Sequence, residues 1–274
     1  MDLSLLRSNL HSWYLENKRD LPWRNTKDPY QIWLSEIILQ QTQVNQGLPY
    51  YNKFIRNYPS VENLARAKEE QVLRDWQGLG YYSRARNLHN TAKIVSEEFD
   101  GHFPNNYKGL LKLKGIGPYT AAAISSFAFG EPNAVLDGNV SRVISRLYAI
   151  NEPINKSTIQ KQLQELADQL IDSTSPGVHN QAMMELGSEI CKPKNPECGK
   201  CPFENACSAL KLGLEKKIPF KVKKSKPKEI HKLYLVFKKD KGLFMRKRAE
   251  NGIWANLYDF PNIDLGTKLN DIEL

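Results

Sequence analysis

Four cysteines lie within 17 residues of this chain, and they constrain its fold more than any other feature. They are Cys191, Cys198, Cys201 and Cys207, spaced Cys-x6-Cys-x2-Cys-x5-Cys. The N-terminus carries no apolar signal-peptide segment, so we expect a cytoplasmic protein. In a reducing compartment, clustered thiols indicate a metal site rather than disulfides. The spacing matches neither paired zinc knuckles nor the common ferredoxin patterns, so it leaves zinc and an iron–sulfur cluster open.

Helix signals run through almost all of residues 3–210. Capping residues precede expected helix starts at Asp28-Pro29, Pro59-Ser60 and Asn155-Lys156-Ser157. Glycines and prolines separate the apolar stretches. The pattern predicts an all-α core over residues 1–210.

The composition changes after residue 210. Residues 211–232 hold nine lysines and two prolines, which predicts an exposed basic linker. Residues 233–237 and 243–245 flank a turn at 239–242 and have the pattern of a β-hairpin. We expect a partial, β-rich segment over residues 233–274, because roughly 40 residues is marginal for an independent core.

The formal net charge is +9 and the isoelectric point is about 9.2. A basic surplus is typical of proteins that meet a phosphate backbone, although many proteins that bind no nucleic acid share it. No apolar run approaches the roughly 18 residues that a membrane helix needs. Charge alone therefore leaves nucleic acid open as a partner, and we expect no membrane association.

Residues 111–123 have the sequence LKLKGIGPYTAAA. Gly115 and Gly117 allow the backbone to approach a ligand closely, and the helix that follows presents free amides and a positive dipole end to a phosphate. Over about residues 108–125 this is the helix–hairpin–helix pattern, which binds DNA backbone without reading its sequence. The alternative is an ordinary tight turn between two helices.

Glu36 lies in the apolar run of residues 33–43, which predicts a helix buried nearly all round. Burial disfavours an ionised carboxyl and raises its pKa, which would suit a general acid near neutral pH. The alternative is a structural glutamate that caps a backbone group or pairs with an arginine.

Asp137 stands where another helix is expected to begin. A carboxylate at a helix N-terminus stays ionised and is well placed to stabilise a developing cation. A simple N-cap is the plainer interpretation, and the two are compatible.

Together and in this order, these segments resemble the helix–hairpin–helix glycosylase superfamily that has a Gly-Pro/Asp catalytic loop, whose [4Fe–4S] loop has this cysteine spacing. The finer resemblance is to the MutY-type adenine DNA glycosylases, and it covers residues 1–210 densely. The motifs that carry it are LPWR (21–24), WLSE (33–36), LQQTQV (39–44), GLGYYSRARNL (78–88) and NQAMMELG (180–187).

The resemblance implies a two-lobed, all-helical core with duplex DNA bound across the cleft, an iron–sulfur loop at 191–207 and a [4Fe–4S] cluster on its four cysteines. It implies a monomer, associated with the nucleoid through DNA, that flips out and hydrolyses adenine mispaired with 8-oxoguanine or guanine. Glu36 matches the acid that protonates adenine at N7. Asp137 matches the carboxylate that stabilises or traps the oxocarbenium ion.

Other positions acquire roles from the same resemblance. They are Tyr119 and Asn139 at the catalytic centre, Arg24 and Glu185 in the adenine pocket, Gln41 and Tyr81 in the wedge near the opposite base, and Gly115, Gly117, Gln43 and Thr120 on the DNA.

Tyr119 distinguishes two kinds of enzyme. Glycosylases that also nick the strand carry a lysine at this position, because a Schiff base needs an amine. We therefore predict hydrolysis without an efficient lyase step, although Lys112 and Lys114 lie nearby in the sequence. The rival interpretations are an endonuclease III-like enzyme and a non-catalytic DNA-binding protein, which would need neither Glu36 nor Asp137.

Residues 233–263 resemble the opening hairpin of the Nudix-like C-terminal domain that helps this family to read the oxidised guanine. The rest of that domain is absent from residues 233–274. The expected selectivity for 8-oxoguanine over guanine is therefore left open.

Overall fold

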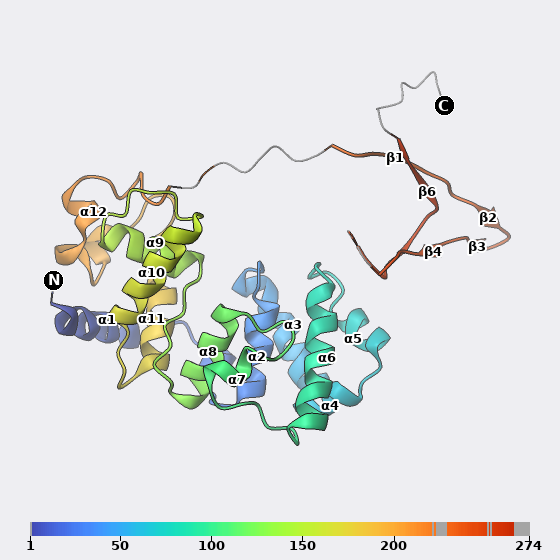
Figure 1. Cartoon of the computed structure of the whole chain (residues 1–274), viewed down its shortest axis with the longest axis horizontal. Helices are drawn as coiled ribbons and strands as arrows, with labels where there is room; N and C mark the ends of the chain where they lie inside the picture. Colours follow the sequence, from blue (N-terminus) through green and yellow to red (C-terminus); the bar gives the residue numbers. More distant parts are fainter. Residues whose placement is uncertain (1, 221, 223–228, 251, 253, 266–274) are drawn as a thin grey trace. The chain divides into compact units, whose positions relative to one another are not determined.

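The computed structural model describes residues 2–220, 222, 229–250, 252 and 254–265. The chain divides into two compact units, residues 1–222 and 223–274. The first unit is helical, and the second contains short strands (Figure 1).

The helical elements of the first unit are α1 (Leu3–Asn17), η1 (Pro22–Arg24), α2 (Pro29–Ile38), α3 (Val44–Asn57), α4 (Val61–Arg66), α5 (Glu69–Asp75), α6 (Ser83–Glu98), α7 (Tyr107–Leu110), α8 (Pro118–Phe129), α9 (Gly138–Leu147), α10 (Ser157–Leu170), α11 (Pro176–Glu189), η2 (Cys198–Lys200), η3 (Glu204–Ala206) and α12 (Ser208–Lys211).

Local capping sets several helix starts. The carboxylate of Asp28 accepts a hydrogen bond from the N–H of Tyr30 at 2.9 Å, at the start of α2. The Ser60 hydroxyl accepts one from the N–H of Asn63 at the start of α4. Both residues satisfy backbone donors that the first helical turn leaves free. The helix starts expected near residues 28, 59 and 155 are confirmed.

Helices α2 to α8 enclose the first of two hydrophobic cores. Its largest side chains include Trp33 of α2 and Trp76, which follows α5. The Trp33 ring lies 5.2 Å from that of Phe103, and the Trp76 ring lies 5.8 Å from that of Phe54. These aromatic contacts hold the first lobe together, because large rings bury the most apolar surface.

The second hydrophobic core contains residues from both the N-terminal and the C-terminal parts of the helical unit. Leu6 and Leu10 of α1 pack there with residues of α9, α10 and α11. Helix α11 crosses close to α9 at Gly187, where an added Cβ would lie 2.6 Å from the Cβ of Asn139. A larger side chain at Gly187 would therefore push Asn139 away from its place on α9.

Helix α8 serves both cores. Ala121 and Ile124 pack into the first core, whereas Ala122 and Ala123 pack into the second. Figure 1 shows α2 and α8 in the middle of the helical unit, between the two lobes. The predicted all-α, two-lobed core is confirmed, and its central helix is buried nearly all round.

The expected exposed linker over residues 211–232 is only partly correct. Ile218 is 1% exposed, and its carbonyl accepts a hydrogen bond from Nε of Arg146 at 2.9 Å. Phe220 forms a parallel bridge with Pro153. The chain therefore packs on the second lobe at residues 218–220, and Val222 is still bound there, because its N–H donates a 3.0 Å hydrogen bond to Oδ1 of Asn155. Residues 223–228 of the expected linker lie outside the described residues.

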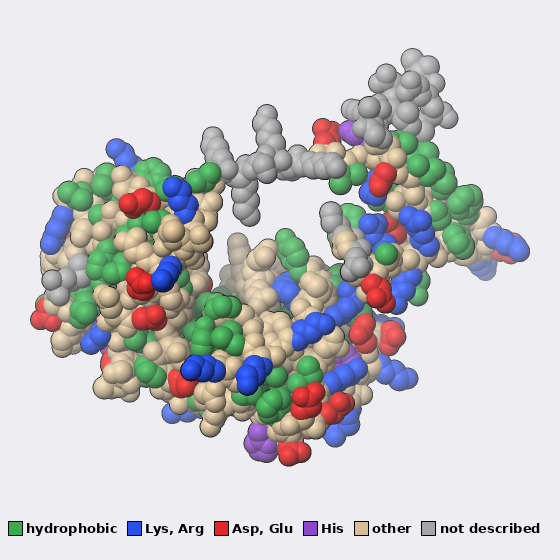
Figure 2. Space-filling view, viewed as in Figure 1, with side chains coloured by type: hydrophobic (Ala, Val, Ile, Leu, Met, Phe, Trp, Pro, Cys, Tyr) green, Lys and Arg blue, Asp and Glu red, His purple; other side chains and the backbone are tan. Residues whose placement is uncertain are grey.

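The second unit is built from strand pairs: β1 (His231–Tyr234) with β6 (Asn262–Leu265), β2 (Lys238–Lys239) with β3 (Gly242–Leu243), and β4 (Arg246–Lys247) with β5 (Tyr258–Asp259). The hairpin expected around residues 239–242 is present, with Lys238 opposite Leu243. Farther from the turn the predicted hairpin is wrong. Leu233 of β1 pairs with Ile263 of β6 and not with the second strand of the hairpin. Apolar side chains line these strands at the surface (Figure 2). Among the described residues, no helix combines the length and the apolar character needed to span a membrane.

Candidate active site

A cleft of about 880 Å³ is lined by side chains of both lobes. The first lobe contributes Glu36 on α2 and the loop of residues 39–43. The second contributes Asp137 and Asn139 at the start of α9 and Glu185 on α11. Residues that are far apart in the sequence therefore meet around one cavity.

Glu36 is 6% exposed and sits on the most buried stretch of α2. Burial, with a smaller contribution from the charge of Asp137, raises its pKa to about 7. The Tyr119 hydroxyl and the charge of Arg24 oppose this shift. A carboxyl in this position exists as both acid and base near neutral pH, so it can deliver a proton there.

Asp137 is the N-cap of α9, as expected, and its carboxylate accepts a 2.7 Å hydrogen bond from the N–H of Val140. Nδ2 of Asn139 donates a second hydrogen bond at 3.1 Å. Burial raises the pKa of Asp137 above its ordinary value, although these hydrogen bonds and the Arg142 charge oppose the shift. Because the effects oppose one another, the ionised state of Asp137 stays a prediction.

Asn139 connects Asp137 to the segment that carries the first cysteine. Its Oδ1 accepts a 2.9 Å hydrogen bond from Nη2 of Arg142. Arg142 also donates to the carbonyl oxygens of Cys191 and Gly187, both at 2.7 Å. The sequence analysis did not identify Arg142, because nothing local marks it.

Tyr119 lies at the start of α8, between the two carboxyls. Burial and the charge of Glu36 raise the pKa of Tyr119 well above its ordinary value, so the phenol stays protonated. Its hydroxyl also lies 3.8 Å from the sulfur of Met184. Tyr119 can donate a hydrogen bond at the centre of the site, but it offers no amine.

Glu185 is completely buried on α11, and two arginines neutralise it. Nη2 of Arg24 lies 2.7 Å from its Oε2, and Nη2 of Arg19 lies 2.6 Å from the same oxygen. The pKa of Glu185 is about 2, because these hydrogen bonds outweigh the burial that would raise it. The predicted partners Arg24 and Glu185 thus lie together, and Arg19 is an additional member that the sequence analysis missed.

Gln41 and Tyr81 lie on separate loops and are both exposed, Tyr81 by 64%. Both residues adopt positive φ angles, 56° for Gln41 and 47° for Tyr81. Such angles are uncommon outside glycine, and they cost free energy that the surrounding structure must offset. Gln41 lines the cleft.

The predicted helix–hairpin–helix element is present, with a first helix of a single turn, α7. Gly115 has a φ of 78°, and an added Cβ would lie 2.9 Å from the Cβ of Asn87. Gly117 is the N-cap of α8 and is exposed. Thr120 is 2% exposed, so its side chain does not lie on the surface and only its backbone amide is a candidate for phosphate contact. Gln43 is exposed at the start of α3 and lines the cleft.

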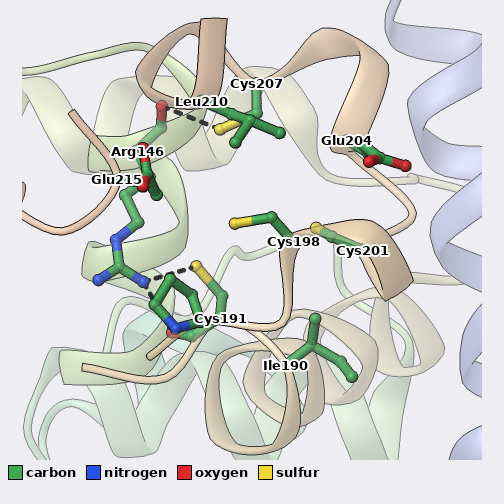
Figure 3. Close-up of a pocket in the computed structure, with 10 residues that line it drawn as sticks. Arg146, Ile190, Cys191, Cys198, Cys201, Glu204, Cys207, Leu210 and Glu215 are labelled. Carbon is green, nitrogen blue, oxygen red and sulfur yellow. Dashed lines mark hydrogen bonds between the residues drawn. The ribbon is translucent and has the colours of Figure 1, made fainter. Parts of the chain in front are cut away.

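The four cysteines surround one pocket between α9 and the end of α11, and none forms a disulfide. Their sulfur atoms face a common interior (Figure 3). Nη1 of Arg146 donates a 3.2 Å hydrogen bond to Sγ of Cys191. Among the described residues, no three metal-binding side chains approach closely enough to share a single ion. Four cysteine thiolates around one pocket are a donor set that suits either zinc or an iron–sulfur cluster.

Comparison with known proteins identifies the family of the chain. Residues 34–169 match the HhH-GPD superfamily base excision DNA repair proteins. An adenine DNA glycosylase from Buchnera aphidicola subsp. Schizaphis graminum is 39% identical, and the alignment covers 96% of this chain and 75% of that protein. One from Mus musculus is 44% identical over 76% of this chain and 42% of its own. The solved structure of a thermostable thymine-DNA glycosylase superposes with a TM-score of 0.70 at 32% identity, over 77% of this chain and 97% of that one.

Proposed function

This chain belongs to the adenine DNA glycosylases of the HhH-GPD superfamily, and we propose that its substrate is adenine mispaired with 8-oxoguanine or guanine in duplex DNA. The chain is thus an enzyme that hydrolyses N-glycosyl bonds in base excision repair. The observation that carries the proposal is the pair of carboxyls, Glu36 and Asp137, that line one cleft from different lobes. A protein that only binds DNA would need neither of them.

Glu36 is the proposed general acid. Protonation at N7 makes the flipped adenine a better leaving group, because the electrons of the glycosidic bond then neutralise the protonated base and adenine departs uncharged. A pKa of about 7 keeps Glu36 protonated in much of the population near neutral pH. Tyr119 lines the same cleft, and its hydroxyl is proposed to orient the Glu36 carboxyl toward the adenine.

Asp137 is the proposed partner of the sugar. Breaking the bond between adenine and C1′ leaves positive charge on the sugar, and a fixed carboxylate stabilises that charge. The Val140 amide and Asn139 hold this carboxylate in place. Water then supplies the hydroxyl to C1′, and its remaining proton returns to the enzyme.

The remaining site residues have proposed binding roles. Arg24 and Glu185 form a charged wall where the adenine edge would lie. Gln41 and Tyr81 would contact the base opposite the excised adenine. Gly115, Gly117, Gln43 and the Thr120 amide would contact the DNA backbone. The chain is expected to act as a monomer.

Tyr119 leads us to propose a monofunctional enzyme. A strand-nicking glycosylase needs an amine at this position to form a Schiff base with C1′. The exposed Lys112 and Lys114 flank the hairpin, but neither lines the cleft. Abasic sites should therefore accumulate without efficient strand breaks.

We propose that Cys191, Cys198, Cys201 and Cys207 hold a [4Fe–4S] cluster. The cluster would crosslink the end of α11 to the segment before α12, and its iron would supply electron-transfer chemistry. Residues 233–274 are proposed to be the start of a Nudix-like domain that contributes to selectivity for the oxidised guanine.

The proposal is tested by single-turnover cleavage of a labelled duplex that contains adenine opposite 8-oxoguanine. The wild type and Glu36→Gln would be compared with and without alkali, which converts abasic sites to breaks. Breaks that appear only after alkali, and only with the wild type, are expected. Breaks without alkali, trapped by borohydride, would favour an endonuclease III-like reaction. No adenine release by a protein with its cluster intact would refute the assigned substrate.

A further inference from the structure

Arg84 of α6 connects the two loops that carry Gln41 and Tyr81, and none of the roles assigned above includes it. Its Nη1 donates hydrogen bonds to the carbonyl oxygens of Ile37 at 3.0 Å, Ile38 at 3.2 Å and Gln40 at 2.5 Å. The first two lie at the C-terminal end of α2, where the last carbonyls of a helix lack partners.

The other side of the same guanidinium binds the second loop. Nη2 donates to the carbonyl oxygens of Leu79 at 3.1 Å and Gly80 at 3.5 Å. The guanidinium also lies over two aromatic rings, 5.1 Å from the centroid of Trp76 and 5.8 Å from that of Tyr81. One planar group therefore satisfies backbone acceptors of both loops and stacks on the Tyr81 ring.

Both loops are in conformations that need such support. Gln41 and Tyr81 have left-handed backbone angles, and Gly78 and Gly80 have φ angles of 102° and 69°. Left-handed residues relax toward ordinary conformations when the contacts that hold them are lost. The Trp76 indole donates a 2.9 Å hydrogen bond to the Gly80 carbonyl, which supports only the second loop. Arg84 thus supplies the bonds that connect one loop to the other.

We infer that Arg84 is a positioning residue that holds Gln41 and Tyr81 in one fixed arrangement and thereby sets how the enzyme discriminates the base opposite adenine. The inference rests on the proposed function, because it takes the opposite base to lie against these two loops. Arg84 does not line the cleft and is not a catalytic residue. Its loss should reduce discrimination more than it reduces cleavage of a bound substrate.

Hydrogen–deuterium exchange tests the structural half of the inference without DNA. Arg84→Met keeps the length of the side chain and removes every hydrogen bond, so exchange in both residues 39–42 and 78–82 should accelerate by about tenfold. Arg84→Lys keeps the charge but cannot bridge five carbonyls, and it should give an intermediate result. Arg86→Met is the matched control, since Arg86 lies on the same helix and makes a 3.8 Å ion pair with Glu69 instead.

Single-turnover rates on duplexes with 8-oxoguanine or guanine opposite adenine test the functional half. In Arg84→Met the ratio of the two rates should fall by about tenfold, and Arg86→Met should leave it unchanged. Unchanged hydrogen–deuterium exchange of residues 39–42 and 78–82 in Arg84→Met would overturn the inference. Faster exchange of these loops with an unchanged ratio of the two cleavage rates would also overturn it. If Arg84→Met is unfolded by circular dichroism, Arg84→Lys decides by the same criteria. Release of adenine from neither duplex by the wild type would refute the proposed function instead, and the exchange data alone would then decide whether Arg84 joins the loops.

Discussion

Glu36 and Asp137 face one cleft from opposite lobes, and the charge of Asp137 raises the pKa of Glu36. The two carboxyls differ in their partners. Glu36 is buried on α2 and Tyr119 opposes the rise of its pKa, whereas Asp137 is held by the N–H of Val140 and by Asn139. The same type of side chain is therefore prepared for two tasks, protonation of a leaving base and stabilisation of a cation.

The rate of adenine release should fall as the pH rises above about 7. Burial raises the Glu36 pKa to about 7, and only the protonated form can donate. Above that pH the single-turnover rate should drop by about tenfold per pH unit. A profile measured at saturating enzyme separates this effect from DNA binding. A rate that is flat from pH 6 to 9 would rule out Glu36 as the acid.

Glu36→Gln should make the protein more stable at pH 8 while abolishing adenine release. The folded pKa of Glu36 is raised, so its ionisation destabilises the fold progressively as the pH rises from the unfolded value near 4.5 to about 7. Removing the charge should raise the free energy of unfolding at pH 8 by about 3 kcal/mol. Urea unfolding at pH 8 and pH 5 measures this. An equal change at the two pH values would show that Glu36 is not the cause.

Asn139→Ala should slow adenine release with little loss of stability. Asn139 is partly exposed, and it bonds to both Asp137 and Arg142. Without it the Asp137 carboxylate is less well oriented, and the single-turnover rate should fall by about tenfold to a hundredfold. Asn17→Ala, which removes a surface amide that contacts only the Trp13 carbonyl, is the control. An unchanged rate in Asn139→Ala would exclude this role.

Protonation of His179 should destabilise the protein as the pH falls. His179 is 2% exposed, and burial, together with the nearby His11, lowers its pKa to about 3. The unfolded chain takes up this proton near pH 6.5. The stabilisation is therefore present above pH 6.5 and is lost as the pH falls toward 3. Between pH 7 and 5 the loss should be about 2 kcal/mol. His179→Gln should lack this part of the pH dependence in urea unfolding, and an unchanged dependence would contradict the assignment.

Purified protein should contain iron and sulfide rather than zinc. The four cysteine sulfurs face one pocket, and thiolates are the ligands that hold iron–sulfur clusters. Visible absorbance and metal analysis should therefore report an iron–sulfur cluster, and Cys198→Ser should lose that absorbance. Bound zinc with no visible band would contradict the cluster assignment.

Much of the site could be predicted from local sequence. Asp137 and Asp28 were recognisable as caps because a cap bonds to an amide only two or three residues away. Glu36 was recognisable because it lies in a run that is rich in apolar residues on one short helix. The cysteines were recognisable because they lie close together in the sequence, so their spacing can be read without the fold.

Other features depended on long-range contacts. Arg19 and Glu185 are 166 positions apart, and Arg84 binds carbonyls 44 to 47 positions away. Their partners are backbone oxygens or a charge on a distant helix, and neither leaves a local signal in the sequence. The burial of Thr120 and the packing of Ile218 likewise follow from how the lobes pack around α8 and α9. The sequence alone thus determined which helices form and which residues are candidates for the chemistry, since capping, periodicity and cysteine spacing act over a few residues. Only the tertiary structure decided the partners of each charge and the relative position of the loops, because those depend on helices that meet from distant parts of the chain.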